Sequence, residues 1–406
     1  MSVGKILSRN ENKIGKITFP NDWSIYKLSD ILKLVKRPIK MEDQKFYNLV
    51  TIKRRFGGMV KRERLRGNQI QVKSQFSVKS GDFVISKRQI SHGACAIVPE
   101  KLDGSIVSNE YNILRNKENL DLEFFNWYVQ LPFMQRYFYL SSDGVHIEKL
   151  LFKLEDWLQR KVCIPEVKEQ KKIAKIISTW DKAIELKEKL IEQKKKQKKG
   201  LMQKLLTGEV RLPGYSGEWK KVKLGEILKE RKETGYTELE LLAITSSKGV
   251  VKRTEVDIKD NSSEDKSKYK RILPNDIGYN TMRMWQGVSG VSKYEGIVSP
   301  AYTILKPTNK VNSNFIGYLF KLPKIINLFR RYSQGLVSDT LNLKYENLKG
   351  IKVTIPQDVE EQKKIAEILL SIDNEIEMLQ EYVNYLKQQK KGLMQLLLTG
   401  KVRVKV

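Results

Sequence analysis

Basic residues gather beside glycines at two places in the sequence. One place surrounds Gly57-Gly58, and the later segment Gly249-Val250-Val251-Lys252-Arg253 repeats the pattern of Gly58-Met59-Val60-Lys61-Arg62. Lysine and arginine neutralise phosphates and release condensed counterions, which is the chemistry of nucleic-acid binding. For any one of these residues, a solvated surface side chain is the ordinary alternative. The residues that we expect to contact DNA here are Lys53, Arg54, Arg55, Lys61, Arg62, Lys252 and Arg253.

A second pair of segments combines arginine, amide side chains and a closing glycine. Residues 280–287 read NTMRMWQG, and residues 86–93, at the same register, read SKRQISHG. Arginine can bind a guanine edge through two hydrogen bonds, and amide side chains also read base edges. We therefore predict DNA contacts for Lys87, Arg88, Arg283 and Gln286. Met284 or Trp285 could equally belong to a hydrophobic core.

Residues for catalysis and metal binding are scarce. Cys95 and Cys163 cannot alone form a zinc site, and we expect two free buried thiols in a reducing cytoplasm. His92 and His146 are the only histidines. The GxxxxGK[ST], GxGxxG and GxSxG motifs are missing, as is the Asn/Asp-Pro-Pro-aromatic motif of amino-methyltransferases. A weak nuclease-like triplet, Asp257-Ile258-Lys259, is expected by chance. The missing motifs predict a non-catalytic chain without a metal site.

The chain of 406 residues is strongly basic, with 76 lysines and arginines against 47 acidic residues. This length suits two or three domains, and the charge of +29 favours nucleic acid first and an acidic membrane surface second. No apolar run is long enough to span a bilayer, and the N-terminus does not read as a secretory signal. We therefore predict a cytoplasmic protein without membrane attachment.

An internal repeat divides the chain. The segment EQKKIA occurs at 169–174 and again at 361–366. KKGLMQKLLTG at 198–208 returns as KKGLMQLLLTG at 390–400, in the same register. Because both matches share one offset, they indicate a duplication. Each half is a variable globular segment followed by a closely matched one, which predicts a pseudo-twofold repeat.

The matched segments have the pattern of long helices that pair with each other. Proline precedes each at 165 and 356, and Gly208 and Gly400 follow. Residues 166–206 hold 13 basic and 6 acidic residues, whereas 357–399 hold 5 and 8, so the two helices attract each other. Lysines at 187, 194 and 198 interrupt the first apolar seam, and two separate helices are the alternative. The predicted pairing residues are Ile173, Ile177, Trp180, Ile184, Leu201, Leu205, Ile365, Leu369, Ile372, Ile376, Leu379 and Leu393.

The variable segments contain short β-rich runs, such as FVIS at 83–86 and LLAIT at 241–245, each followed later by a short helical pattern. This indicates an α+β protein with two mixed α/β domains. We expect the first domain over 1–165, the first helix over 166–208, the second domain over 209–355, and the second helix with the C-terminal tail over 356–406.

These motifs resemble the specificity subunit of type I restriction–modification systems. EQKKIA, the KKGLMQ(K/L)LLTG ending, and YNTMRMWQG followed by GIVSPAYTIL carry the resemblance over residues 20–406. It implies two target recognition domains, each reading half of a bipartite asymmetric DNA target. The helices would pair as an antiparallel coiled coil, set the gap between half-sites and dock the modification subunits, usually two.

The resemblance also implies that this chain holds no cofactor and that its partners hold the cofactors of the assembly. Modification subunits would carry S-adenosylmethionine and methylate adenine, and restriction subunits would add an ATP- and Mg²⁺-dependent translocase and nuclease. A stand-alone bipartite DNA-binding or architectural protein is the second hypothesis. A nuclease or methyltransferase acting alone is disfavoured by the missing motifs.

Overall fold

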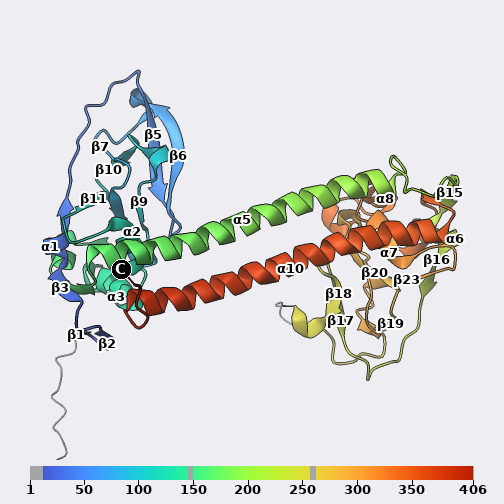
Figure 1. The fold of residues 1–406 in the computed structure, drawn as a ribbon. Coiled ribbons are helices and arrows are strands. Elements are labelled where there is room, and N and C mark those ends of the chain that lie inside the picture. Colours follow the sequence, from blue (N-terminus) through green and yellow to red (C-terminus); the bar gives the residue numbers. More distant parts are fainter. Residues whose placement is uncertain (1–11, 145–149, 257–261, 406) are drawn as a thin grey trace, which may run out of the picture. The chain divides into compact units, whose positions relative to one another are not determined.

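The structure, a computed structural model, describes residues 12–144, 150–256 and 262–405 (Figure 1). Two compact units divide the chain, Met1–Leu186 with Tyr382–Val406, and Lys187–Glu381. Each unit mixes helices and strands, which confirms the predicted α+β class. His146 and Asp257-Ile258-Lys259 lie outside the described residues.

The first unit holds two four-stranded sheets, with strand orders β6-β5-β10-β7 and β4-β11-β8-β9. Strand β10 runs parallel to β5, and the other pairings in these sheets are antiparallel. The strands are β1 (Asn12–Ile14), β2 (Ile17–Phe19), β3 (Ser24–Lys27), β4 (Leu32–Leu34), β5 (Phe46–Ile52), β6 (Met59–Arg66), β7 (Gln75–Ser77), β8 (Phe83–Ser86), β9 (Cys95–Ile97), β10 (Ile106–Ser108), β11 (Tyr111–Asn116), β12 (Ser142–Asp143), β13 (Leu151–Phe152) and β14 (Lys161–Ile164). The helices are α1 (Leu28–Ile31), α2 (Leu122–Tyr128), α3 (Pro132–Leu140) and α4 (Leu154–Leu158), with 3₁₀ turns η1 (Gly67–Gln69), η2 (Ile90–His92) and η3 (Glu100–Leu102).

Aromatic side chains of the first unit join α2, α3 and α4 to the second sheet. Trp157 of α4 is fully buried, and its ring stacks on Phe138 with centroids 5.3 Å apart. Phe125 of α2 meets Phe83 of β8 edge to face at 5.3 Å. Such pairs add to the free energy gained from buried apolar area. This packing fixes β8, the strand that leads into the 86–93 segment.

The second unit repeats part of this plan around a four-stranded antiparallel sheet of order β16-β23-β20-β21. The pairs β15-β24, β17-β18 and β19-β22 complete its strands. The strands are β15 (Trp219–Lys223), β16 (Leu228–Arg231), β17 (Leu242–Thr245), β18 (Gly249–Lys252), β19 (Lys270–Ile272), β20 (Ile277–Asn280), β21 (Ser289–Val291), β22 (Gly296–Val298), β23 (Tyr302–Pro307) and β24 (Lys352–Pro356). The helices are α6 (Leu224–Ile227), α7 (Ser313–Leu319), α8 (Pro323–Tyr332) and α9 (Tyr345–Leu348), with 3₁₀ turns η5 (Arg253–Glu255), η6 (Met284–Gln286) and η7 (Ser338–Thr340).

The two repeated segments form helices α5 (Val167–Leu206) and α10 (Val359–Leu398). Each begins with the same glutamine joint. The amide of Gln170 donates to the carbonyl oxygens of Pro165 at 2.8 Å and Asn119 at 3.0 Å, and its oxygen accepts from the backbone NH of Asp121 at 2.8 Å. In the second unit, Gln362 makes the matching three bonds to Pro356, Lys310 and Asn312. These buried amides tie each helix to its own domain.

Within each unit, the two helices run antiparallel. In the first unit, Glu169 binds Arg403, which follows α10, and Asp181 binds Lys390. Because the α10 partner moves toward lower numbers as the α5 number rises, the helices point in opposite directions.

The same order holds in the second unit. Lys194 binds Glu375 at 2.8 Å, Lys198 binds Asp373 at 2.6 Å, and Arg211, after α5, binds Glu361 at 2.7 Å. Two of the lysines that interrupt the seam are therefore paired with carboxylates of the acidic helix, as the charge pattern predicts.

Candidate nucleic-acid interface

In the first unit, two of the predicted basic segments form one surface. The tip of the β5–β6 hairpin lies against the turn that contains η2. The Arg54 Nε donates to Gln89 Oε1 at 2.8 Å, and the Arg55 backbone NH donates to the His92 carbonyl at 2.7 Å. A Cβ added at Gly93 would lie 2.9 Å from the Phe56 ring, so this glycine permits the close approach. We call residues 53–58 and 87–93 the hairpin surface.

The hairpin surface is held in a costly backbone conformation. Arg55 has φ 57° and Phe56 has φ 56°, both in the left-handed region. This conformation costs an L-residue roughly 1–2 kcal/mol, and such positions concentrate at functional sites. Backbone bonds to His92 and Gly93 hold the two residues there. The conformation exposes three adjacent cationic side chains, Lys53, Arg54 and Arg55.

Of the remaining predicted cations of the first unit, Lys87 and Arg88 belong to this surface, and Lys61 and Arg62 lie beside it. Lys61 and Arg62 are exposed on β6, Arg88 is exposed, and Lys87 is half-buried. Arg62 pairs with Glu63 and Arg88 with Glu110, both at 2.7 Å. Exposed ion pairs are weak, so phosphates can compete with these carboxylates.

An aromatic side chain that the sequence analysis did not single out lies on the same hairpin. The guanidinium groups of Arg64 and Arg66 lie 5.1 Å and 5.2 Å from the centroid of the exposed Phe46 ring. Phe46 pairs with Arg66 across β5 and β6. Stacking on a ring holds a guanidinium in place at low entropic cost, which suits phosphate binding. Alternation of arginines in the sequence RERLR was the signal for this arrangement.

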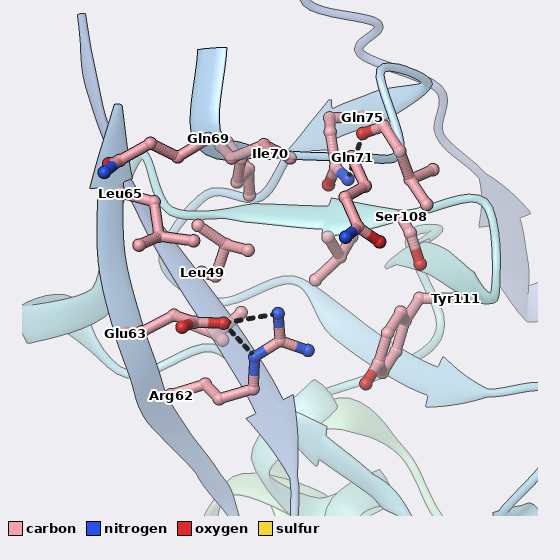
Figure 2. Close-up of a pocket in the computed structure, with 14 residues that line it drawn as sticks. Leu49, Arg62, Glu63, Leu65, Gln69, Ile70, Gln71, Gln75, Ser108 and Tyr111 are labelled. Carbon is pink, nitrogen blue, oxygen red and sulfur yellow. Dashed lines mark hydrogen bonds and ion pairs between the residues drawn. The ribbon is translucent and has the colours of Figure 1, made fainter. Parts of the chain in front are cut away.

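A cavity of about 390 Å³ opens beside β6 in the first unit (Figure 2). Its floor is apolar and includes Leu49, and its polar lining carries amide, hydroxyl, carboxylate and guanidinium groups. These polar groups can donate to and accept from base edges. The polar residues that line the cavity are Arg62, Glu63, Gln69, Gln71, Gln75, Ser108 and Tyr111, of which Gln75 is buried.

The second unit builds a related surface from different side chains. The hairpin β17–β18 contacts β21, where a Cβ on Gly290 would lie 2.6 Å from the Gly249 Cα. Directly before β21, Arg283 and Gln286 are exposed around η6. Met284 is fully buried, so it is a core residue, whereas Trp285 is half-buried and its Nε1 donates to the Met282 carbonyl at 3.0 Å.

Two predicted cations of the second unit make contacts inside their own domain. Lys252 binds Glu240 at 2.9 Å, and the Glu240 carboxylate raises the pKa of Lys252. The Arg253 Nη1 donates to the Val256 carbonyl at 3.2 Å. Both side chains are half-buried. The repeated Gly-x-Val-Lys-Arg pattern therefore gives equivalent hairpins with unequal exposure of charge.

A half-buried lysine, Lys321, positions the η6 turn. The Lys321 Nζ donates to the carbonyl oxygens of Gly287 at 2.8 Å and Ser289 at 2.7 Å. Burial, together with the charge of Lys198, lowers the pKa of Lys321 to about 8. This residue anchors the segment that presents Arg283 and Gln286, and its position in the sequence gave no sign of that role.

The predicted helix-pairing residues all lie on α5 and α10. Leu393 packs against the first core, together with Ile173 and Ile177, whereas Leu201 packs against the second. The fully or largely buried residues are Ile173, Ile177, Ile184, Leu205, Ile365, Leu369 and Ile376, and the half-buried ones are Trp180, Leu201, Ile372, Leu379 and Leu393.

The two thiols are free and buried, as the sequence predicts. Burial raises the pKa of Cys163 to about 12 and raises that of Cys95 further, which makes both poor nucleophiles. Among residues 12–144, 150–256 and 262–405, no group of three or more His, Cys, Asp or Glu could hold a metal ion. In that same part of the chain, no helix is long and apolar enough to cross a membrane.

Comparison with known proteins gives one consistent result. The type I restriction modification DNA specificity domain matches residues 20–195 and 216–388. The type I restriction enzyme MjaVIII specificity subunit of Methanocaldococcus jannaschii is 26% identical over 453 residues, covering 98% of this chain and 96% of that protein.

Two solved structures share the fold. The HsdS subunit from Thermoanaerobacter tengcongensis has a TM-score of 0.53 at 16% identity, covering 96% of this chain and 99% of that one. The S subunit from M. genitalium has a TM-score of 0.57 at 16% identity, covering 95% and 97%. With the domain matched twice along one duplicated chain, this protein belongs to the family of type I restriction–modification DNA specificity subunits.

Proposed function

We propose that the chain reads a bipartite, asymmetric DNA target, one half-site with each domain. As a member of this family it is a DNA-recognition subunit and not the catalyst. The pair of hairpin-and-turn surfaces, one in each unit, is the observation that supports one half-site for each domain. Both present cations beside a close glycine contact, at Gly93 and at Gly290. Because their side chains differ, the two half-sites differ as well.

The proposed DNA contacts combine phosphate and base recognition. In the first domain, Lys53, Arg54, Arg55, Lys61, Arg62, Lys87 and Arg88 supply a dense positive surface. In the second, Arg283 and Gln286 can bind guanine and adenine edges. Lys252 and Arg253 support their own hairpin, and we assign them a smaller share of binding because of their contacts with Glu240 and Val256.

The helix pair is proposed to set the gap between half-sites and to bind two modification subunits. Exposed apolar side chains on α10, such as Met378 at 62% and Tyr385 at 55%, are available for such contacts. Restriction subunits would join the same assembly in the cytoplasm. We propose domain limits at 1–165 and 209–355, with the helix segments at 166–208 and 356–406. In this assembly, S-adenosylmethionine, ATP and Mg²⁺ belong to the partner subunits.

A methylome comparison tests this function. The genome of the host is sequenced by a single-molecule method with the gene intact, deleted, and restored. We expect an adenine-methylated split motif with a fixed gap to vanish on deletion and to return on restoration. A restored gene carrying Arg54→Ala, Arg55→Ala and Arg88→Ala should leave that motif under-methylated. Methylation that persists unchanged in the deletion strain would refute the proposal.

A binding selection separates this function from that of a stand-alone DNA-binding protein. The full chain is incubated with random duplexes, with and without its modification subunits. We expect the same split motif in both selections, with much tighter binding in the complex. Equal affinity with and without modification subunits would favour the stand-alone alternative.

A further inference from the structure

A loop of the second unit holds two apolar side chains in solvent. It follows α8 and spans residues 333–342. Leu336 is fully exposed, at 102% of its reference area, and the adjacent Val337 is 60% exposed. Exposing large apolar side chains to water is unfavourable, and two together at a loop tip indicate a surface that becomes covered on binding.

Hydrogen bonds at its base and tip hold the loop in one conformation. Gln334 and Asn342 exchange backbone bonds of 2.9 Å and 2.8 Å, which close the base. The Thr340 hydroxyl donates to the Val337 carbonyl at 3.0 Å, within the turn η7. Gly335 has φ 140°, and a Cβ there would lie 2.6 Å from the Thr340 carbonyl oxygen. The loop therefore presents Leu336 outward, on a closed base.

The loop adjoins the segment that we propose reads bases. The Leu343 backbone NH donates to the Thr281 carbonyl at 2.9 Å, one residue from Met282, which is 40% exposed. On α8, the Arg330 guanidinium lies 6.0 Å from the centroid of the Trp285 ring. The apolar tip and the Arg283–Gln286 turn thus extend from neighbouring backbone segments.

Charge around the loop fits a polyanionic partner. Residues 330–344 contain three cations, Arg330, Arg331 and Lys344, and a single carboxylate, Asp339. Arg331 is exposed two residues before the loop, and Lys344 is exposed two residues after it. Cations that flank an apolar tip match the way in which proteins hold a duplex by its phosphates while a leucine enters between base pairs.

We infer that Leu336, supported by Val337, is a wedge that inserts between two base pairs of the half-site bound by the second domain. The inference rests on the proposed DNA-reading function and adds to it a deformation of the duplex. Partial unstacking costs free energy, which the burial of Leu336 and the neighbouring phosphate contacts offset. The free-energy cost of unstacking depends on the two base pairs that Leu336 separates. The chain would therefore discriminate between sequences there even though no side chain touches a base edge.

The test uses the full chain and a duplex that it enriches from a random pool. 2-Aminopurine replaces one adenine at a time, because its fluorescence rises when it unstacks. We expect a rise at one step of one half-site with the wild-type chain. Leu336→Ala should abolish that rise and weaken binding about tenfold, as expected for loss of most of a buried leucine side chain. Leu336→Met, which retains an apolar wedge, should keep the signal.

Two controls separate wedging from simple loss of contact. Leu186→Ala removes a leucine that is 55% exposed on α5 and should change neither binding nor fluorescence. Arg331→Ala should reduce the slope of log affinity against log salt by about one phosphate contact, whereas Leu336→Ala should leave that slope unchanged. The unfolding temperature of Leu336→Ala should equal that of wild type, because the side chain is fully exposed.

The outcomes are distinguishable. Sequence-specific binding by wild type with no change in affinity or fluorescence for Leu336→Ala would overturn the wedge and leave the proposed function intact. If that variant instead lost only its modification subunits, the loop would be a protein-binding surface and the wedge would again be overturned. A wild-type chain that enriched no duplex, with or without modification subunits, would overturn the proposed function and the wedge together.

Discussion

Two glycines inside the long helices allow a sharp test of the helix structure. Gly200 of α5 and Gly392 of α10 occupy equivalent places in the repeated KKGLMQ segments, each six residues before the end of its helix. A Cβ at either position would meet no atom within 4 Å outside the local helix. We predict that Gly200→Ala and Gly392→Ala each stabilise the chain.

The magnitude follows from helix propensity alone, because neither alanine would contact a neighbouring element. Glycine inside a helix is about 1 kcal/mol less favourable than alanine. For a unit of this size, that gain raises the unfolding temperature by roughly 2–4 °C. Since Gly200 and Gly392 belong to different units, the two gains in unfolding free energy should add in the double variant. The last turns are fixed by buried Leu205 and Leu397, so fraying does not dilute the effect.

Gly290→Ala is the matched control, because its Cβ would lie 2.6 Å from the Gly249 Cα and 2.8 Å from the Val250 backbone nitrogen. Backbone atoms cannot rotate away, so this alanine should destabilise the second unit. The assay is calorimetric unfolding of the full chain and each variant at one pH and salt concentration. If Gly200→Ala and Gly392→Ala lowered the unfolding temperature, the open surroundings of these glycines, and the argument from propensity, would be refuted.

Three further predictions concern ion pairs, pH and DNA. Lys198→Asp should lower the unfolding free energy by about 1–3 kcal/mol, since it removes a half-buried ion pair, and adding Asp373→Lys should restore most of it in urea titrations; no restoration would mean that the pair does not fix the helices. Burial depresses the pKa of Lys321 from 10.5 to about 8, so between these pH values the unfolded chain keeps a proton on Lys321 that the folded chain has released. The free energy of unfolding should therefore rise with pH in this range, by at most roughly 1.4 kcal/mol per pH unit relative to Lys321→Met. A stability difference between the two proteins that stays constant from pH 8 to 10.5 would contradict this. In DNA binding, Lys53→Ala should weaken binding to all duplexes alike and reduce the slope of log affinity against log salt by about 0.9. Arg283→Ala should instead reduce discrimination at one base pair of the target by about 1–3 kcal/mol in competition assays. If the two variants changed the salt slope and the base preference in the same way, the assigned roles would be refuted.

The duplication and the helices were predictable because their signals are local. Repeated motifs and apolar spacing indicated two helices; α5 begins two residues after Pro165 and α10 three residues after Pro356, and each helix ends two residues before its glycine. The lysines at 194 and 198 appeared as interruptions of the seam. Their pairing with Glu375 and Asp373 depends on the α10 face that they meet, which only the fold reveals.

The site was predictable in its composition more than in its arrangement. The basic hairpin and the 86–93 segment were found separately, but contacts between Arg54 and Gln89 depend on how two β-hairpin ends approach each other. A pattern alone could not show that Lys252 turns toward Glu240, since that carboxylate lies before β17. Lys321 and Leu336 lie in segments without a motif, and their roles follow from burial and exposure.

The glutamine joint has a consequence for how such chains acquire new targets. Gln170 and Gln362 make the same three hydrogen bonds, one to a proline carbonyl and two to the loop that precedes α2 or α7. The connection between recognition domain and long helix is therefore built in the same way in both units. The two acceptors and the one donor that bind each glutamine are all backbone groups, which any side-chain sequence can supply. A gene crossover at either EQKKIA segment would therefore exchange a whole recognition domain while preserving the hydrogen bonds that attach it to its helix. New DNA specificities can arise by exchange of whole recognition domains, without changes in the helices or in the surfaces that bind partner subunits.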